Sequence, residues 1–313
     1  MTSSDERFYQ FVSLFSGNTA AYGTEQGGCV RQEASPARYM GHLQGEESIG
    51  IYPMVCVDNE WIVHWGCVDL DVKADHKRRW DYETRDAAWI AACNLKRALA
   101  AMDLEAWVES TKSGGYHVWV FSRDWVYAAD MRHCLLAACR LVDVPPTEVN
   151  PKNTHFDDHT ALGNYVRLPY PAAFVGGVER PMVDMNGDPI AWNDFVDHAW
   201  RSRSDQTTIS EIAALYVPPP KPTIHHEATR TIVTSELGTA SRRLRAIIEN
   251  GPLKQEDRSG WLYYVARLCA DDGLTIREAE EIVALCDERH TRKFVDRRDG
   301  AARIAATVEK AYS

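Results

Sequence analysis

Two aspartates stand two residues apart inside an apolar run, Val68-Asp69-Leu70-Asp71-Val72. Alternate residues of a β-strand face the same side, so Asp69 and Asp71 project together while their apolar neighbours enter a core. Carboxylates on a partly buried strand are costly unless a cation neutralises them, and magnesium and manganese prefer oxygen ligands. The pair therefore indicates a seat for a divalent cation. An exposed strand end whose carboxylates pair with a lysine is the plainer alternative at this spacing.

A glycine-rich turn, Ser110-Thr111-Lys112-Ser113-Gly114-Gly115, leads directly into Tyr116-His117-Val118. The glycines Gly114 and Gly115 allow backbone amides to approach an anion, and Ser110, Lys112 and Ser113 offer hydroxyl and ammonium donors. Strand alternation puts His117 on the face opposite its two neighbours. These groups together suit a triphosphate, although a hairpin turn without a ligand explains the glycine pair equally well.

A third group of polar residues follows in two short segments. In Gly163-Asn164-Tyr165-Val166-Arg167-Leu168-Pro169, Arg167 shares a face with Tyr165 if Val166 and Leu168 face the core. A guanidinium there can grip phosphate oxygens bidentately, or can be an ordinary surface arginine.

The segment before it, Pro146 to Lys152, offers Glu148 as a third carboxylate and Lys152 as a phosphate donor. The adjacent pair Asp157 and Asp158 competes with Glu148 for that role, from a loop that is a less rigid platform than a strand.

These residues need an α/β framework to position them. The hydrophobic patterns predict two amphipathic helices, at 84–102 and 128–141. Between and around them they predict strands at 49–57, 61–72, 106–109, 116–121, 147–149 and 165–168. A proline run, Pro218-Pro219-Pro220-Lys221-Pro222, then cannot continue a helix or a central strand, and the pattern after it is helical. We therefore expect an α/β domain over 1–215, a proline-rich linker over 216–234 and an all-helical domain over 235–313.

Composition sets the class of protein. With 313 residues, 45% hydrophobic and 26% charged, the chain reads as a globular protein of two domains. The net charge of −10 argues against coating nucleic acid by bulk electrostatics, yet leaves room for a local basic groove. One basic cluster stands near the C-terminus and contains Arg292, Lys293, Arg297 and Arg298.

The sequence contains no apolar run of the roughly 18 residues that a membrane helix needs and no signal peptide at its start, so we expect no membrane association and a cytoplasmic protein. None of its eight cysteines forms a Cys-x-x-Cys pair, which favours free thiols and predicts no zinc.

The order of these motifs resembles the archaeo-eukaryotic primase superfamily, in the primase-polymerase form of phage and plasmid replication proteins. Asp69-Leu70-Asp71 matches the first motif of that family, and Ser113 to His117 resembles its small-residue-x-His motif. Glu148 resembles the third acidic position, and residues 163–169 resemble the Gly-Asn and Arg-Leu-Pro segment that follows it. The resemblance runs from about residue 14 to residue 169. The stretch 251–298 is similar to the small helical domain that follows the catalytic domain in many phage primases.

The resemblance implies an α/β (α+β) catalytic domain with an N-terminal part, 1–60, and an RNA-recognition-like antiparallel sheet within 61–215. It also implies template-directed nucleotidyl transfer in which Asp69, Asp71 and Glu148 hold two Mg²⁺ or Mn²⁺ ions. His117, Ser113 and Arg167 would hold the phosphates of the incoming nucleotide. The remaining nucleotide-binding candidates are Ser110, Lys112, Gly114, Gly115, Lys152 and Asn164.

The implied partners are a single-stranded DNA template, NTPs or dNTPs and a helicase in the same or another chain, in the host cytoplasm of a bacteriophage or mobile replicon. Arg292, Lys293, Arg297 and Arg298 are the candidate template contacts. Two other classes of function stay open at this point. One is a replication initiator or single-strand-binding module without synthesis, and the other is a metal-dependent phosphoesterase.

Overall fold

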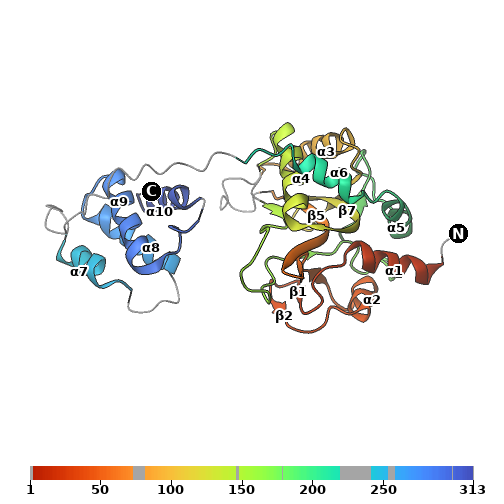
Figure 1. Ribbon diagram of the computed structural model, residues 1–313, viewed down its shortest axis with the longest axis horizontal. Coiled ribbons are helices and arrows are strands. Elements are labelled where there is room, and N and C mark those ends of the chain that lie inside the picture. The colour runs from red at the N-terminus through yellow and green to blue at the C-terminus, as the bar shows by residue number, and fades with distance from the viewer. Residues whose placement is uncertain are drawn as a thin grey trace. The chain divides into compact units, whose positions relative to one another are not determined.

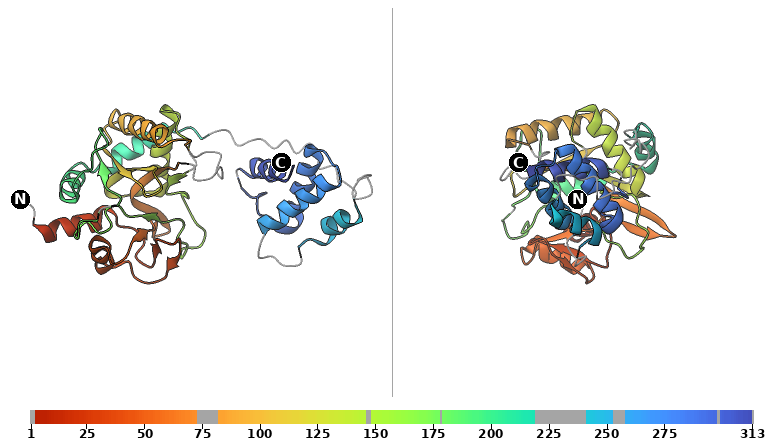
Figure 2. Two further views of the ribbon diagram at one scale, coloured as in Figure 1. Left: turned by 180° about the vertical axis from the view of Figure 1, so that it is seen from behind. Right: turned by 90° about the vertical axis from the view of Figure 1, so that its left-hand side faces the viewer.

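A computed structural model describes residues 3–72, 82–145, 148–177, 179–218, 241–252, 258–297 and 299–312. The chain divides into two compact units, unit 1 (Met1–Val217) and unit 2 (Pro218–Ser313). Both units are drawn in Figure 1 and from two further sides in Figure 2, and each is described here by itself. Most of the expected linker, 216–234, lies outside the described residues.

The described part of unit 1 contains a six-stranded antiparallel sheet built around two long strands. Its members are β4 (Val55–Val57), β5 (Glu60–Leu70), β6 (Ala106–Ser110), β7 (Tyr116–Tyr127), β8 (Val149–Asn150) and β10 (Met182–Val183). The order is β10-β6-β7-β5-β4, and β8 pairs with β5. In this register His117 of β7 lies between Glu109 of β6 and Asp69 of β5 as a direct cross-strand neighbour of each. The pairing thus brings three ionisable side chains side by side on one face.

One face of this sheet packs on helices. Val68, Leu70, Val118 and Val120 are buried there against α3 (Arg85–Ala100), α4 (Ala128–Leu141) and α6 (Gln206–Ala213), through side chains such as Leu95, Leu135 and Ile209. The helices α3 and α4 are those that the apolar spacing predicted, one or two residues shorter at most at each end.

The opposite face is also buried over most of its length. Trp65, Trp119 and Phe121 pack there with Phe15, at the end of α1 (Ser4–Leu14), and Phe195 of α5 (Trp192–Arg201). Ring centroids of Phe15 lie 5.1 Å from those of both Trp119 and Phe121. Aromatic residues at alternate positions of β7 explain this second core. Polar Asp69 and His117 come where the aromatic side chains stop.

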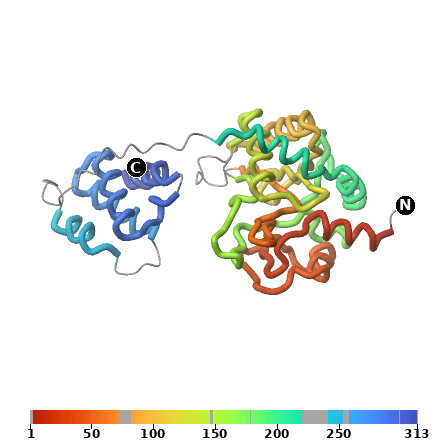
Figure 3. The backbone as a smooth tube through the Cα atoms, viewed as in Figure 1, coloured from red at the N-terminus to blue at the C-terminus, as the bar shows by residue number. Residues whose placement is uncertain are grey.

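A second, four-stranded antiparallel sheet stands beside the first. It has the order β2-β1-β3-β9, with β1 (Tyr22–Thr24), β2 (Cys29–Val30), β3 (Ile49–Ile51) and β9 (Val166–Arg167). Residues 49–57, predicted as one strand, form β3 in this sheet and β4 in the large one. The chain changes sheets at Tyr52-Pro53-Met54, where Pro53 has no N–H to continue a ladder. Figure 3 shows this N-terminal part, coloured red to orange, as a layer of its own within unit 1.

The helix α2 (Pro36–Gln44) is fixed to the small sheet through a buried histidine. His42 donates from Nε2 to the carbonyl of Pro169 at 2.8 Å and accepts at Nδ1 from the N–H of Ile49 at 3.3 Å. Burial lowers the pKa of His42 to about 4, although the hydrogen bond to Pro169 acts the other way. The neutral imidazole therefore joins α2, β3 and the segment after β9.

Unit 2 is helical in the part that the structure describes. It contains α7 (Arg242–Asn250), α8 (Arg258–Asp271), α9 (Ile276–Cys286), a π-helical turn (Asp287–Thr291) and α10 (Gly300–Tyr312), packed around a core that includes Leu262, Val283 and Val308. An α/β part with antiparallel sheets followed by a helical part is the predicted fold class, which is thus confirmed. None of the helices described in either unit has the length and apolar character needed to cross a membrane.

Candidate active site

A cavity of about 570 Å³ receives side chains from both sheets of unit 1. Its lining comprises Glu25, Tyr52, Asp69, Asp71, Thr111, Lys112, Ser113, His117, Glu148, Asn150, Lys152, Gly163, Asn164, Tyr165, Val166, Arg167 and Arg180. Cavities of roughly 300–1,000 Å³ are typical of small-molecule sites. Few of these residues are apolar, so the cavity suits a charged ligand.

A buried ion-pair chain forms one wall of the cavity. His117 Nδ1 lies 2.8 Å from Glu109 Oε2, and His117 Nε2 lies 3.6 Å from Asp69 Oδ1. The indole N–H of Trp119 also donates to Glu109, at 2.8 Å. Burial opposes a charge on His117, but the carboxylates of Glu109 and Asp69 outweigh it and raise the pKa of His117 to about 10. At neutral pH the ring is an imidazolium beside the cavity.

The three predicted metal ligands all line this cavity. Asp69 and Asp71 lie at and just after the end of β5, and β8 pairs with β5 so that Val149 is opposite Val68. Glu148, one residue earlier, therefore comes at the level of Asp69. Arg132 of α4 holds this segment in place by donating to the carbonyls of Val149 and Pro151.

The chemistry of these donors fits a hard divalent cation. Asp69 Oδ1 is buried without a hydrogen bond, and the other candidate ligands are also carboxylates. Glu148 is paired with Lys152. Within the described ranges, no group of three His, Cys, Asp or Glu side chains is arranged as a metal centre.

The competing carboxylates Asp157 and Asp158 are not part of the cavity lining. Asp157 is fully exposed and lies 3.6 Å from His155 Nε2. Asp158 accepts hydrogen bonds from the backbone N–H and the hydroxyl of Thr160, and these bonds lower its pKa.

The glycine-rich turn contributes Thr111, Lys112 and Ser113 to the lining, whereas Ser110, Gly114 and Gly115 are outside it. Ser110 instead accepts a hydrogen bond from Arg85, which also donates to the hydroxyl of Tyr116. Gly114 has φ +86°, and a Cβ on Gly115 would lie 2.5 Å from the carbonyl oxygen of Leu70. The second glycine thus brings the turn into contact with the end of β5.

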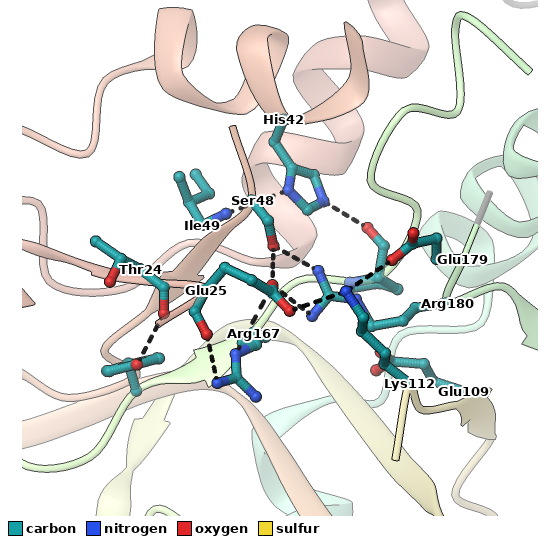
Figure 4. Close-up of polar contacts among 12 residues, drawn as sticks. Thr24, Glu25, His42, Ser48, Ile49, Glu109, Lys112, Arg167, Glu179 and Arg180 are labelled. Atoms are coloured by element: carbon teal, nitrogen blue, oxygen red, sulfur yellow. Dashed lines mark hydrogen bonds and ion pairs between the residues drawn. The ribbon is translucent and has the colours of Figure 1, made fainter. Parts of the chain in front are cut away.

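A group of cations forms the other wall, around the carboxylate of Glu25 (Figure 4). Glu25 Oε2 lies 3.6 Å from Arg180 Nη1 and 3.9 Å from Arg167 Nε, and Oε1 lies 3.8 Å from Lys112 Nζ. Ser48 Oγ donates to Glu25 at 2.7 Å. Burial would raise the pKa of Glu25, but Ser48 and the three cations together lower it.

Tyr165 packs on the small sheet at the cavity edge. Its ring lies on Gly23 and Gly50, because a Cβ on either glycine would be 2.3 Å from a ring atom. Its hydroxyl donates to the carbonyl of Thr24 at 3.0 Å, and its ring centroid is 5.4 Å from that of Tyr52. Two tyrosines therefore stand next to the cationic wall.

The cavity brings together most of the residues that the motifs singled out: Asp69, Asp71, Lys112, Ser113, His117, Glu148, Lys152, Asn164 and Arg167. Sequence reasoning missed Glu25, Glu109 and Arg180. Of these, only Glu109 had a signal, as a charged residue on a short apolar strand. Glu25 and Arg180 belong to segments without a motif.

The candidate template contacts belong to unit 2. Arg292 Nη2 lies 2.6 Å from Asp296, and Arg297 Nε lies 3.4 Å from Asp299. The backbone N–H of Lys293 donates to Asp287, and Arg298 lies outside the described residues. The two arginines thus already have acidic partners on neighbouring turns.

Comparison with known proteins gives a family match to unit 1. A family model described as "TOTE conflict system, Archaeo-Eukaryotic Primase domain" matches residues 30–191, a little over half of the chain. No curated protein matches. Among solved structures, "Crystal structure of primase RepB'" is 13% identical and is matched over 97% of this chain and 93% of that chain, with a TM-score of 0.29.

Proposed function

The chain belongs to the archaeo-eukaryotic primase family, and on that premise we propose that it is a primase-polymerase that synthesises and extends primers by template-directed nucleotidyl transfer. The observation that carries the proposal is one cavity lined by Asp69, Asp71, Glu148 and His117 and also by the cations Lys112, Arg167 and Arg180. Phosphoryl transfer needs this combination, since it depends on positioning and on neutralising charge. A phosphoesterase would need no grip on a triphosphate, so it would leave Lys112 and Arg167 unused.

The cationic wall would bind the triphosphate of the incoming nucleotide. His117, as an imidazolium, offers its Nε2–H to phosphate oxygens, while Glu109 holds the other ring nitrogen. Arg167 can grip two oxygens at once, and Lys112 and Ser113 act from the turn. Asn164 and Lys152, which also line the cavity, complete the set.

The carboxylate wall would hold the metal. Asp69, Asp71 and Glu148 are the proposed ligands, and Mg²⁺ or Mn²⁺ bound there, as a pair, would activate the primer 3′-hydroxyl and stabilise the departing pyrophosphate. In the absence of a metal ion, the carboxylate of Glu148 forms an ion pair with Lys152. The new bond joins the 3′-oxygen to the α-phosphorus, and the bond to pyrophosphate breaks.

We assign catalysis to unit 1 and assistance in primer initiation to unit 2. The template is single-stranded DNA, the substrates are NTPs or dNTPs, and a helicase in the same or another chain would expose the template. A replication initiator without synthesis would not need the carboxylates of the cavity.

The test is incorporation of labelled nucleotides on single-stranded DNA with Mg²⁺ or Mn²⁺, with and without a primer. We expect metal-dependent products from the wild type and none from Asp69→Asn/Asp71→Asn or Glu148→Gln. Circular dichroism should show that these variants fold, because Asn and Gln keep the size of the side chains that they replace and His117 keeps its hydrogen bond with Glu109.

The matched control is Asp157→Asn/Asp158→Asn, which removes the same number of charges outside the cavity. It should retain activity. Loss of activity in this control with retention in Glu148→Gln would assign the third ligand to the loop. A wild type without any metal-dependent product would refute the polymerase proposal.

A further inference from the structure

Glu25 is the one carboxylate in the described cavity lining that stands among the cations. It is contributed by the turn between β1 and β2, whereas Asp69, Asp71 and Glu148 come from the large sheet. Lys112, Arg167 and Arg180 surround it, and Glu179 approaches Lys112 from the other side at 3.4 Å. A phosphate-binding wall that already contains an acid needs an explanation.

The contacts of Glu25 neutralise these cations without saturating them. Its oxygens lie 3.6–3.9 Å from the three cationic nitrogens, beyond the 2.7–3.0 Å of a charge-assisted hydrogen bond. Arg167 Nε and Arg180 Nε are buried without a hydrogen bond. The Arg180 side chain is only 4% exposed. Donors are therefore left over for an anion that carries more oxygens than one carboxylate.

We propose that Glu25 is an internal counter-ion, which holds Lys112, Arg167 and Arg180 in the free protein and is displaced when a triphosphate binds. This inference rests on the proposed function, and it assigns Arg180 as a phosphate-binding residue. The ligand of these three cations is the polyphosphate group of the nucleotide, independent of its sugar and base.

The backbone around Glu25 allows such a displacement by side-chain rotation alone. Arg167 Nη2 donates to the carbonyl of Glu25 at 2.9 Å, and Tyr165 holds the carbonyl of Thr24. These bonds fix the main chain. The next residues, Gln26, Gly27 and Gly28, are exposed, and a released carboxylate can turn toward solvent there. The arginines need not move.

Displacement makes binding depend on the charge of the ligand. A triphosphate presents several anionic oxygens to the three cations, and these contacts offset the loss of the contacts with the Glu25 carboxylate. Orthophosphate presents few more anionic oxygens than that carboxylate does. The counter-ion thus favours triphosphate over orthophosphate. Removing its charge should tighten the binding of both.

The experiment is calorimetric titration of the full chain with inorganic tripolyphosphate in metal-free buffer. We expect Glu25→Gln to bind tripolyphosphate about tenfold more tightly than the wild type, since its amide oxygen still accepts from Ser48 but no longer neutralises the cations. Glu33→Gln, an exposed site with the same charge change, should bind like the wild type.

Glu25→Asp changes the length of the side chain but keeps its charge, so it serves as a second variant at the same position in case Glu25→Gln does not fold. It keeps the carboxylate, and we expect wild-type affinity. Equal or weaker binding by Glu25→Gln, or tight binding by Glu25→Asp, would overturn the proposal and leave Glu25 as a residue that positions the arginines. So would failure of all forms to bind tripolyphosphate. Incorporation assays are read separately, so an inactive protein that shows the expected affinities refutes the polymerase proposal alone.

Discussion

At the scale of single residues, the ion-pair chain of Glu109, His117 and Asp69 decides the charge of the cavity wall. Glu109 is fully buried and accepts from both His117 and Trp119. A buried carboxylate is stable only while such partners remain, and the imidazolium is stable only beside the carboxylate. The hydrogen bonds of Glu109 thus hold both His117 and Trp119 in place.

We therefore predict that Glu109→Ala lowers the free energy of unfolding by about 3 kcal/mol, since it removes the buried hydrogen-bond partner of both His117 Nδ1 and the Trp119 indole N–H. Urea denaturation at pH 7 measures it. The control is Glu105→Ala, which removes a half-exposed partner of Lys96 and should cost about 1 kcal/mol or less. Equal losses in the two variants would contradict a special role for Glu109.

The sequence predicted those site residues that stand on alternating strands or beside glycines. Asp69 and His117 belong to long strands, where a period of two fixes the face of each side chain, and Asp71 directly follows the end of β5. Glu25 reaches the cavity because β3 pairs with both β1 and β9, and Arg180 reaches it from the residues before β10, which pairs with β6. No local pattern encodes a pairing between segments more than a hundred residues apart.

At the scale of elements, the contact between the glycine-rich turn and β5 couples the phosphate donors to the metal ligands. Gly115 lies against the backbone carbonyl of Leu70, which cannot rotate away as a side chain can. This contact therefore fixes the position of the turn that bears Lys112 and Ser113 relative to Asp71.

Gly115→Ala should push the turn off the strand, with a loss of stability of about 1–3 kcal/mol from overpacking and at least tenfold weaker nucleotide binding. Titration with a nucleoside triphosphate measures the second effect. Gly177→Ala is the matched control, since its Cβ would meet only the Cβ of Ala172 at 3.6 Å, an ordinary contact. Unchanged affinity in Gly115→Ala would show that the turn acts independently of β5.

The docking of α2 predicts a pH dependence of stability. The pKa of His42 is about 4 in the folded chain and about 6.5 when unfolded, so the unfolded state binds the proton more tightly. The neutral His42 side chain therefore contributes to the free energy of unfolding fully above pH 6.5. This contribution, about 3 kcal/mol in total, is lost as the pH falls from 6.5 to about 4.

Denaturant unfolding at pH 7, 5.5 and 4 tests this. The wild type should lose about 3 kcal/mol more over that range than His42→Gln, whose side chain does not titrate. His159→Gln, at an exposed histidine, should keep the wild-type slope. If the free energy of unfolding depended on pH in the same way in the wild type and in His42→Gln, protonation of the buried ring would not destabilise the fold.

Elements with a long apolar period were predictable, whereas the short strands were predicted only in part: β3, β4, β8 and β9 overlap the expected 49–57, 147–149 and 165–168, and β1, β2 and β10 were not expected. The helices α3 and α4 and the strands β5 to β7 each carry enough repeats to show their period. Strands of two or three residues, such as β1, β2 and β10, are too short to show one. The small sheet therefore depends on pairing between distant segments, and it and the residues beside it supply one part of the cavity lining.

At the scale of the whole molecule, the two units have separate cores. The buried clusters of unit 1 end at Ala213, and the buried cluster of unit 2 begins at Leu244. Arg140 donates to the carbonyl of Val217, the last residue of unit 1. Each unit thus has the apolar burial that independent folding requires.

A fragment of residues 1–217 should therefore unfold within about 2 °C of the corresponding transition of the full chain, because it contains both buried clusters described for unit 1. Differential scanning calorimetry measures both. The fragment should also bind tripolyphosphate with unchanged affinity. A fragment that melts far lower would place part of the stabilising core outside unit 1.

The aromatic core on the second face of the large sheet is shared by both sheets: Trp65 and Trp119 of one and Ile49 and Val166 of the other belong to the same buried cluster. Separating the walls of the cavity would expose these side chains to water. Substrate must therefore enter and leave between walls that keep their apolar surface covered. The heat-capacity change on nucleotide binding should accordingly be small, since that quantity reports apolar surface gained or lost to solvent.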